Sequence, residues 1–164
     1  MFLFKAAHSL DPLEEFGDFV TENPQENAKI IAKAEDLEIR TDKVATILAQ
    51  TLFDTNILKQ IAPRVSLLKH FLKTEKDQKG FLGGLERLIG LLHPAELMAK
   101  TPLILKAFYD ADLLEEEIIL SWGEKVSKKY VDKKVGKEIH AKAEPFLKWL
   151  QEAEEEESSE DDEE

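Results

Sequence analysis

The chain has 164 residues, of which 43% are hydrophobic and 34% are charged, a composition typical of one folded domain with its own core. It contains no cysteine, which excludes disulfides, thiolate catalysis and cysteine-ligated zinc within these residues. The net charge of −12 comes mostly from the end of the chain, where ten acids and no base lie between 152 and 164; we expect such a chain to repel nucleic acid and to attract basic protein segments.

The first half of the chain carries apolar side chains at helical spacing. A helix is expected over Leu10–Val20, and it ends before Asn23-Pro24 because the residue before a proline avoids the α region. Pro63 is expected to interrupt a short helical stretch. Three longer helices are predicted, over Glu26–Leu37, from Thr41 as a cap to Leu52, and over Val65–Leu72.

The segment Lys76–Leu92 is predicted to form one helix with Phe81, Leu85 and Leu92 among the residues of its apolar face. Gly83, Gly84 and Gly90 within it lower helix stability by roughly 1 kcal/mol each. Close approach of a neighbouring helix would explain why glycine is present there.

The second half predicts three more helices. Thr101 caps the first, with a proline at the first helical position. Asp112 and Glu115 have the form of a capping box and open the second, which runs through Trp122. The last extends from about Lys133 to Ala153, and Pro145 inside it is expected to bend or split it.

About eight to ten helices with short links and no convincing strand predict an all-α fold, with antiparallel helix pairs stacked in a HEAT-like manner. Residues 1–25 are expected to be an extension with one short helix, residues 26–153 the folded domain, and residues 154–164 a disordered acidic tail.

Signals for enzymatic or metal chemistry are weak. The four histidines have no partner at metal-ligand spacing, and Gly80–Gly84 lacks the lysine of a phosphate-binding loop, so neither a metal nor a cofactor is expected. No Gly-x-Ser-x-Gly motif is present. No apolar run approaches the roughly 20 residues of a membrane span, and Met1–Lys5 turns polar too early for a signal peptide. We therefore expect a soluble protein.

The segment from Tyr109 to Trp122 combines acids with aromatic and aliphatic residues. Negative charge at a helix N-terminus accounts for about half of this pattern. An acidic surface bordered by aromatic side chains is also what a lysine-rich peptide would bind. The sequence also contains two basic groups: Lys59, Arg64, Lys69 and Lys73, and Lys125, Lys128 and Lys129. Each is interpreted either as an ordinary solvated surface or as a second docking surface.

The order Tyr-Asp-Ala-Asp-Leu-Leu-Glu-Glu-Glu over 109–117, then Ser121-Trp122, Ser127-Lys128-Lys129-Tyr130 and the run from Lys142 through Trp149, resembles the second acidic-aromatic box of the C-terminal W2 domain of the translation initiation factor five family. The segment 49–54 resembles the first box. Trp122 and Trp149 fit the two tryptophans for which the domain is named, and the resemblance spans roughly residues 28–157.

The resemblance implies a HEAT-like scaffold in the cytoplasm, acting as a monomer in translation initiation. It implies binding to the Lys-rich N-terminal region of initiation factor two beta, and contacts with the c subunit of initiation factor three, initiation factor one and the scaffold subunit of initiation factor four. The family's GTPase-activating segment belongs to an N-terminal domain that is absent here, so the resemblance implies no enzyme activity.

The resemblance assigns partner contacts to a set of residues on this segment. The electrostatic contacts are Asp110, Asp112, Glu115, Glu116 and Glu117, and the anchors are Tyr109 and Trp122. Phe146 and Trp149 are expected to support the surface from beneath. Ser158 and Ser159 precede acids and fit an acidophilic kinase of the casein kinase two type.

Other functions stay open at this stage. A W2 domain also occurs in the epsilon subunit of initiation factor two-B, where it promotes guanine-nucleotide exchange. A W2-containing mimic would compete for the same partners, and a helical scaffold outside translation is a further alternative.

Overall fold

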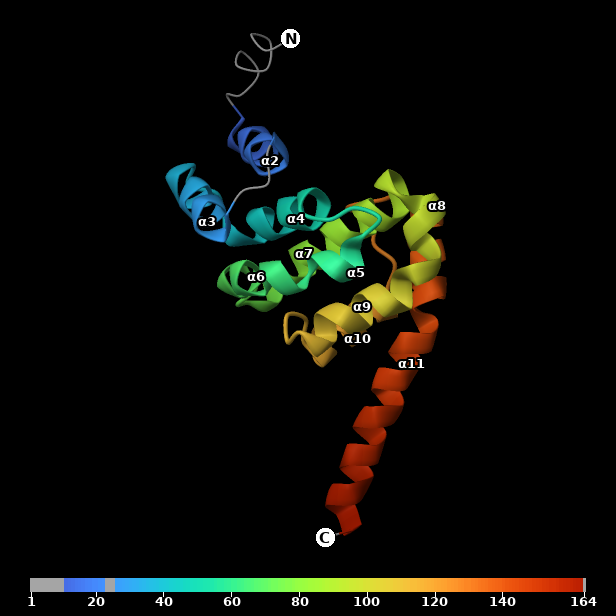
Figure 1. Ribbon diagram of the computed structural model, residues 1–164. Helices are drawn as coiled ribbons and strands as arrows, with labels where there is room; N and C mark the ends of the chain where they lie inside the picture. Colours follow the sequence, from blue (N-terminus) through green and yellow to red (C-terminus); the bar gives the residue numbers. More distant parts are fainter. Residues whose placement is uncertain (1–10, 23–25, 164) are drawn as a thin grey trace.

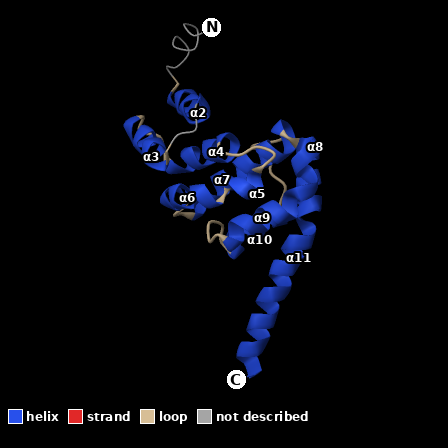
Figure 2. Cartoon of the chain, viewed as in Figure 1, coloured by secondary structure: helices blue, strands red, loops and turns tan. Residues whose placement is uncertain are grey.

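The computed structural model describes residues 11–22 and 26–163, and the fold over these residues is all-α without a strand (Figures 1 and 2). The α-helices are α2 (Pro12–Glu22), α3 (Asn27–Asp36), α4 (Thr41–Thr51), α5 (Ile57–Gln60), α6 (Val65–Phe71), α7 (Glu75–Arg87), α8 (Pro94–Leu97), α9 (Thr101–Asp110), α10 (Glu116–Glu124) and α11 (Lys133–Glu163). Short 3-10 turns, η1 (Ala62–Arg64) and η3 (Met98–Lys100), and a π-helix, η2 (Leu88–Leu92), join some of them.

The helices stack as neighbouring pairs, as the sequence predicted. At one end α2 packs on α4 and α3 packs against α2 and α6, α4 packs along α7 in the middle, and α9 and α10 lie against α11 at the other end (Figure 1). Three phenylalanines join these layers, because the ring of Phe108 is 5.0 Å from that of Phe81 and 5.6 Å from that of Phe53, both edge to face. One continuous core therefore positions the surface of α9, α10 and α11.

Glycines on α7 allow α4 to approach closely. A Cβ atom on Gly80 would lie 2.5 Å from the carbonyl oxygen of Asp42, and one on Gly84 would lie 2.4 Å from that of Thr46. Real Cβ atoms do not approach backbone oxygens this closely. The sequence-based explanation is confirmed for Gly84, and Gly80, which it did not name, has the same role.

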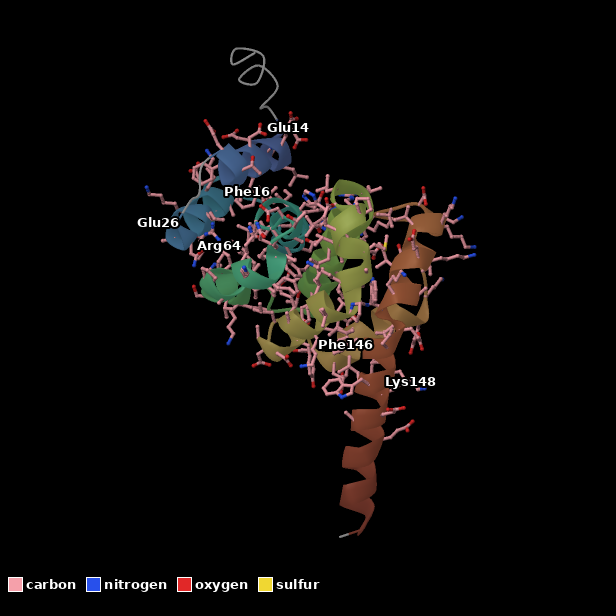
Figure 3. All side chains as sticks on the ribbon, turned by 45° about the vertical axis from the view of Figure 1, so that its right-hand side comes forward. Glu14, Phe16, Glu26, Arg64, Phe146 and Lys148 are labelled. Atoms are coloured by element: carbon pink, nitrogen blue, oxygen red, sulfur yellow. The ribbon has the colours of Figure 1, made fainter. Side chains whose placement is uncertain are left out.

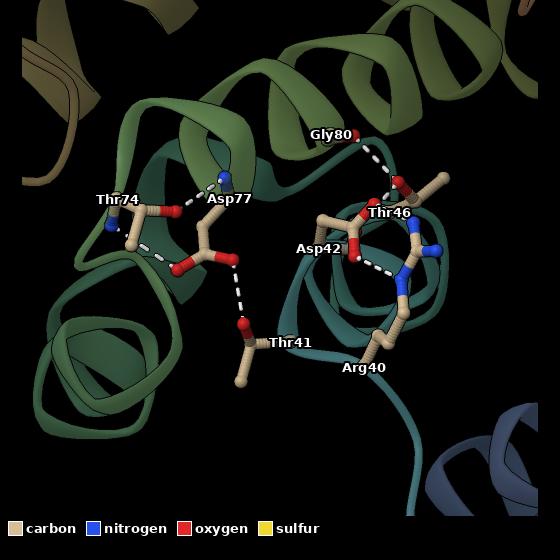
Figure 4. A network of polar contacts seen from close by, with 7 residues as sticks. All are labelled: Arg40, Thr41, Asp42, Thr46, Thr74, Asp77 and Gly80. Atoms are coloured by element: carbon tan, nitrogen blue, oxygen red, sulfur yellow. Dashed lines mark hydrogen bonds and ion pairs between the residues drawn. The ribbon is translucent and has the colours of Figure 1, made fainter.

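Polar contacts hold the same two helices together (Figure 4). Thr74 caps α7 in a reciprocal box with Asp77, and the second carboxylate oxygen of Asp77 accepts a 2.6 Å hydrogen bond from the hydroxyl of Thr41. The hydroxyl of Thr46 donates to the carbonyl of Gly80 at 2.8 Å. The prediction that Thr41 caps its own helix is therefore wrong. Thr41 lies in the first turn of α4 and connects that helix to α7.

The helix predicted over Lys76–Leu92 changes its geometry near its end. After Arg87 the backbone continues as the π-helix η2, which adds a residue to the turn and rotates the following side chains. The sequence placed Leu92 on the buried face, but in the π-helix Leu92 is 52% exposed and Leu91 is 55% exposed.

The two ends of the chain differ from their predicted boundaries. The helix expected over Leu10–Val20 is α2, which buries Phe16 and Val20 in the core; Leu10 and Asn23-Pro24 lie outside the described residues. The last helix is continuous through Pro145 and reaches Glu163, beyond the predicted end at Ala153. The division of the chain into extension, domain and acidic tail remains a prediction.

Within the part of the chain that the structure describes, no single helix is long and apolar enough to cross a membrane. The segments Glu75–Leu92 and Pro94–Asp110 together have the length and composition of a membrane span, but the chain bends by 108° between them.

Candidate protein-binding surface

The acidic segment begins at the end of α9, where the chain turns sharply. The backbone N–H of Asp112 donates to the carbonyl of Tyr109, and that of Leu113 donates to the carbonyl of Phe108, both at 3.0 Å. This pair of hydrogen bonds forms a Schellman motif, in which Asp112 adopts the left-handed conformation with a φ of 66°. The predicted capping box at Asp112 is therefore wrong, because that residue ends α9 and Glu115 is the N-cap of α10.

The turn displays most of the predicted acids to solvent. Asp110, Asp112, Glu115 and Glu117 are exposed, whereas Glu116 is half-buried and has a partner. Leu113 and Leu114 between them are buried, which fixes the backbone of the turn. The backbone N–H of Glu115 donates to the buried side chain of Gln78 at 2.9 Å, so the start of α10 is attached to α7.

One of these acids has an internal cationic partner. The Lys106 ammonium lies 2.7 Å from a carboxylate oxygen of Asp110, one helical turn away on α9. Both side chains are about half exposed. Asp112, Glu115 and Glu117 form no ion pair with any described residue, so their charge is available to a partner.

Three aromatic rings lie next to the acids. Tyr109 contacts Phe146 and Trp149 of α11 at centroid distances of 5.9 and 6.2 Å, and Phe146 and Trp149 stack at 5.8 Å. Phe146 is buried, as predicted, and Figure 3 shows it on α11, far from Glu14 and Glu26 at the α2–α3 end. Trp149 is 46% exposed, so it does not support the surface from beneath but forms part of it.

An apolar hollow of about 230 Å³ opens beside the exposed indole. It lies between the start of α9 and the middle of α11, and Leu103 at its edge is 56% exposed. Its lining residues are Pro102, Leu103, Lys106, Pro145, Phe146 and Trp149. The sequence indicated none of the α9 members, although Lys106 could have been found from its spacing of four residues before Asp110.

Trp122 takes the supporting role instead. Its indole Nε1 donates a 2.9 Å hydrogen bond to Glu86, and its ring lies 4.0 Å from that of His140. Burial raises the pKa of Glu86, although the bond from Trp122 and the nearby Arg87 oppose the rise. Burial also lowers the pKa of His140, opposed by a hydrogen bond with the backbone of Gly123.

The predicted basic residues do not line a common hollow. Lys59 and Arg64 border one of about 470 Å³ between α2, α4 and η1, and Arg64 donates a 2.8 Å hydrogen bond to Asn27 of α3. Lys129 borders another of about 390 Å³, with Lys43 and Arg87, which the sequence did not indicate. The others, Lys69, Lys73, Lys125 and Lys128, are exposed.

The two predicted phosphorylation sites lie in the last helix. Ser158 and Ser159 fall within the final turns of α11, and their modification remains a prediction. In the described ranges 11–22 and 26–163, no three histidine, aspartate or glutamate side chains are grouped so that they could hold a metal ion.

Comparison with known proteins places this surface in context. The profile of the W2 family, described as eIF4-gamma/eIF5/eIF2-epsilon, matches residues 77–160, which contain the acidic turn and the aromatic cluster. The chain is 46% identical over 148 residues to eukaryotic translation initiation factor 5 of Mus musculus, covering 84% of this chain and 33% of that protein. It is 37% identical over 162 residues to the Saccharomyces cerevisiae protein of the same name, covering 94% of this chain and 40% of that protein.

A solved structure agrees with the sequence comparison. The structure titled "The C-terminal Domain of Translation Initiation Factor 5 at low pH" superposes with a TM-score of 0.87 at 43% identity, covering 92% of this chain and 97% of that one. The chain spans about a third of the length of the curated animal relatives that it matches.

Proposed function

The chain belongs to the W2 family and corresponds to the C-terminal domain of translation initiation factor 5, and from this premise we propose that it is a docking scaffold that binds lysine-rich segments of other initiation factors. The first such partner is the Lys-rich N-terminal region of initiation factor two beta. The c subunit of initiation factor three, initiation factor one and the scaffold subunit of initiation factor four are further partners, and the chain acts as a monomer in the cytoplasm.

The observation that carries this proposal is the exposed acidic turn beside an exposed tryptophan. Asp112, Glu115 and Glu117 have no ion pair with the described residues, and Trp149 offers an accessible ring on the neighbouring helix. A single exposed pair contributes only about 0.2–1 kcal/mol. Several acids acting together, with an aromatic side chain to contact the aliphatic stems of lysines, give useful affinity.

The surface itself is held rigidly. Buried Leu113 and Leu114, the Schellman motif and the bond between Glu115 and Gln78 fix the turn on the core. A preorganised surface loses less conformational entropy when a flexible peptide binds. The geometry therefore supports a role in which this chain is the ordered partner and the lysine-rich segment folds onto it.

Charge reversal tests the assignment. Replacing Asp112, Glu115 and Glu117 by lysine is expected to abolish binding of a polylysine-box peptide in calorimetry at low salt, because attraction becomes repulsion. The matched control reverses Glu22, Glu26 and Asp36, three exposed acids at the α2–α3 end, and changes net charge equally. Equal loss in both variants would refute the assigned surface, as would unchanged affinity in the first.

The exchange function of the epsilon subunit of factor two-B is the alternative within the same family. The relatives described above at 37–46% identity are factor 5 proteins, which favours docking over exchange. Catalytic acceleration of GDP release from initiation factor two by the folded chain would contradict the docking proposal.

A further inference from the structure

We infer that Lys106 occupies the position that a partner's lysine takes on this surface, and that it competes with the partner for Asp110 and Trp149. The inference rests on the proposed function and adds to it a specific lysine subsite and an internal competitor. It follows from the contacts around one ammonium group on α9.

The ammonium of Lys106 makes two contacts that suit a bound lysine. It lies 2.7 Å from Oδ2 of Asp110 and 5.6 Å from the centroid of the Trp149 ring. A carboxylate neutralises the charge, and the indole face attracts a cation within about 6 Å. The two contacts come from different helices, so they define a site in space and not only a pair along one helix.

The hollow beside these contacts fits the rest of a lysine side chain. Leu103, Pro145 and Phe146 present carbon atoms next to the indole, and four methylene groups of a lysine stem can lie along them. The volume of about 230 Å³ accommodates a side chain but not a folded element. Tyr109 and Phe146 hold the indole in place through the ring contacts described above.

Charge complementarity identifies the occupant. The subsite continues along the chain into Asp112, Glu115 and Glu117, so a peptide entering it meets negative charge on that side. An isolated apolar peptide would gain nothing from these carboxylates, whereas a run of lysines contacts them in succession. A lysine-rich segment with one side chain on Trp149 is the occupant that this arrangement favours.

Lys106 is displaceable because it is not buried. Its side chain is 46% exposed and that of Asp110 is 53% exposed, so both are solvated before a partner arrives. Exposed pairs of this type are weak. The competition is therefore modest, and removing Lys106 should strengthen partner binding about two- to tenfold.

The test compares two lysine-to-methionine variants. Lys106→Met removes the competitor and keeps an aliphatic side chain of similar length. Lys79→Met is the matched control, because Lys79 forms an exposed pair with Glu75 at the same i,i+4 spacing, 2.9 Å apart, on α7. Both variants change net charge equally, so long-range attraction of a cationic peptide rises equally in both.

Calorimetry with a polylysine-box peptide decides the outcome. The inference requires that Lys106→Met binds about two- to tenfold tighter than wild type and clearly tighter than Lys79→Met. Equal gains in the two variants, or weaker binding by Lys106→Met, overturn it while leaving the docking function in place. A folded wild type that binds no peptide at low salt overturns the docking function itself.

The indole signals supply an independent readout. The chain has two tryptophans, so the indole N–H resonance of Trp149 can be followed beside that of Trp122. We expect peptide to shift the Trp149 signal much more than that of Trp122, which is bonded to Glu86. Trp149→Ala should lose most of the gain from Lys106→Met when the two are combined. A Trp149 signal that does not move on peptide binding contradicts the subsite.

Discussion

Two residues other than glycine have a positive φ among the described residues, a backbone conformation that their side chains do not indicate in the sequence. Glu38 (φ 55°) and Asp112 (φ 66°) both follow a helix and occupy the left-handed position of a Schellman motif. Glycine is the usual residue there, because a Cβ atom makes this conformation unfavourable by about 1–2 kcal/mol. At Asp112 the acid contributes charge to the proposed binding surface, whereas Glu38 lies after α3, away from it.

Replacing Glu38 by glycine is therefore expected to stabilise the chain. Relief of backbone strain exceeds the added entropy of the unfolded state, for a net gain of roughly 0.5–1 kcal/mol. The midpoint of urea unfolding should rise at constant slope. Glu38→Ala, which keeps the Cβ atom, is the control and should not reproduce the gain. A lower midpoint for the glycine variant would contradict the strain argument.

Glu86 makes stability depend on pH in a direction that the geometry fixes. One of its carboxylate oxygens is buried without a described hydrogen-bond partner, and burial raises its pKa. The folded chain then holds this proton more tightly than the unfolded chain, so its contribution to stability falls as pH rises above the ordinary carboxyl range. His140 acts oppositely, because its lowered pKa removes stability as pH falls below the ordinary imidazole value.

Glu86→Gln separates these two effects. The variant keeps an oxygen to accept from Trp122 but carries no charge, so it loses the Glu86 dependence and retains that of His140. Relative to wild type, its free energy of unfolding should improve steadily as pH is raised from about 4 to 7. Denaturant unfolding at several pH values measures this difference. A constant difference over that range would show that Glu86 does not ionise differently in the folded state.

At the scale of elements, α4 and α7 pack closely along each other. The carbonyl of Thr46 and the methyl of Ala49 would lie 2.4 and 2.6 Å from a Cβ atom on Gly84. Backbone atoms cannot yield as a flexible side chain can. The two helices would have to separate, and the hydrogen bonds from Thr46 to Gly80 and from Thr41 to Asp77 would loosen with them.

Gly84→Ala is expected to destabilise the chain by about 1–3 kcal/mol despite the better helix propensity of alanine. Gly17→Ala on α2 is the matched control, because the nearest atom to its Cβ would be Ile47 Cγ2 at 3.8 Å, an ordinary contact. That variant should gain up to about 1 kcal/mol from propensity. Thermal unfolding of both decides the matter, and equal effects at the two positions would contradict close helix packing.

The helical spacing of apolar residues predicted the helices and their stacking, because burial of one stripe per helix is a local property. It did not predict features that depend on contacts between helices. Thr41 lies at a helix start but bonds to Asp77 of α7, and the π-helix turns Leu92 outward. Trp149 was expected to support the surface from beneath, yet it is 46% exposed and borders an open hollow between α11 and α9. Asp112 was misassigned because the same local sequence is compatible with an N-cap of the following helix and with the C′ residue of the preceding one.

At the scale of the whole molecule, charge is distributed unevenly between the ends. The acids of the α9–α10 turn lie on the same side of the molecule as α11, which carries the run of glutamates from Glu152 onward. The net charge of −12 therefore acts mainly there. A cationic segment approaching from solution is attracted over a distance set by the ionic strength, and the local contacts at Trp149 act only after it arrives.

These two contributions respond differently to salt. The Debye length falls from about 10 Å at 0.1 M to about 3 Å at 1 M, so exposed acid–lysine attraction is mostly screened at high salt. Contact of lysine stems with the indole and Leu103 is apolar and persists. We expect the affinity for a polylysine-box peptide to fall at least tenfold over that range. We expect Trp149→Ala to lower affinity by a similar factor at both salt concentrations, because contact with the ring is short-range and is screened much less than the attraction between separated charges. A tryptophan effect that disappears together with the charge effect would mean that the indole acts only by positioning the acids and does not contact the peptide.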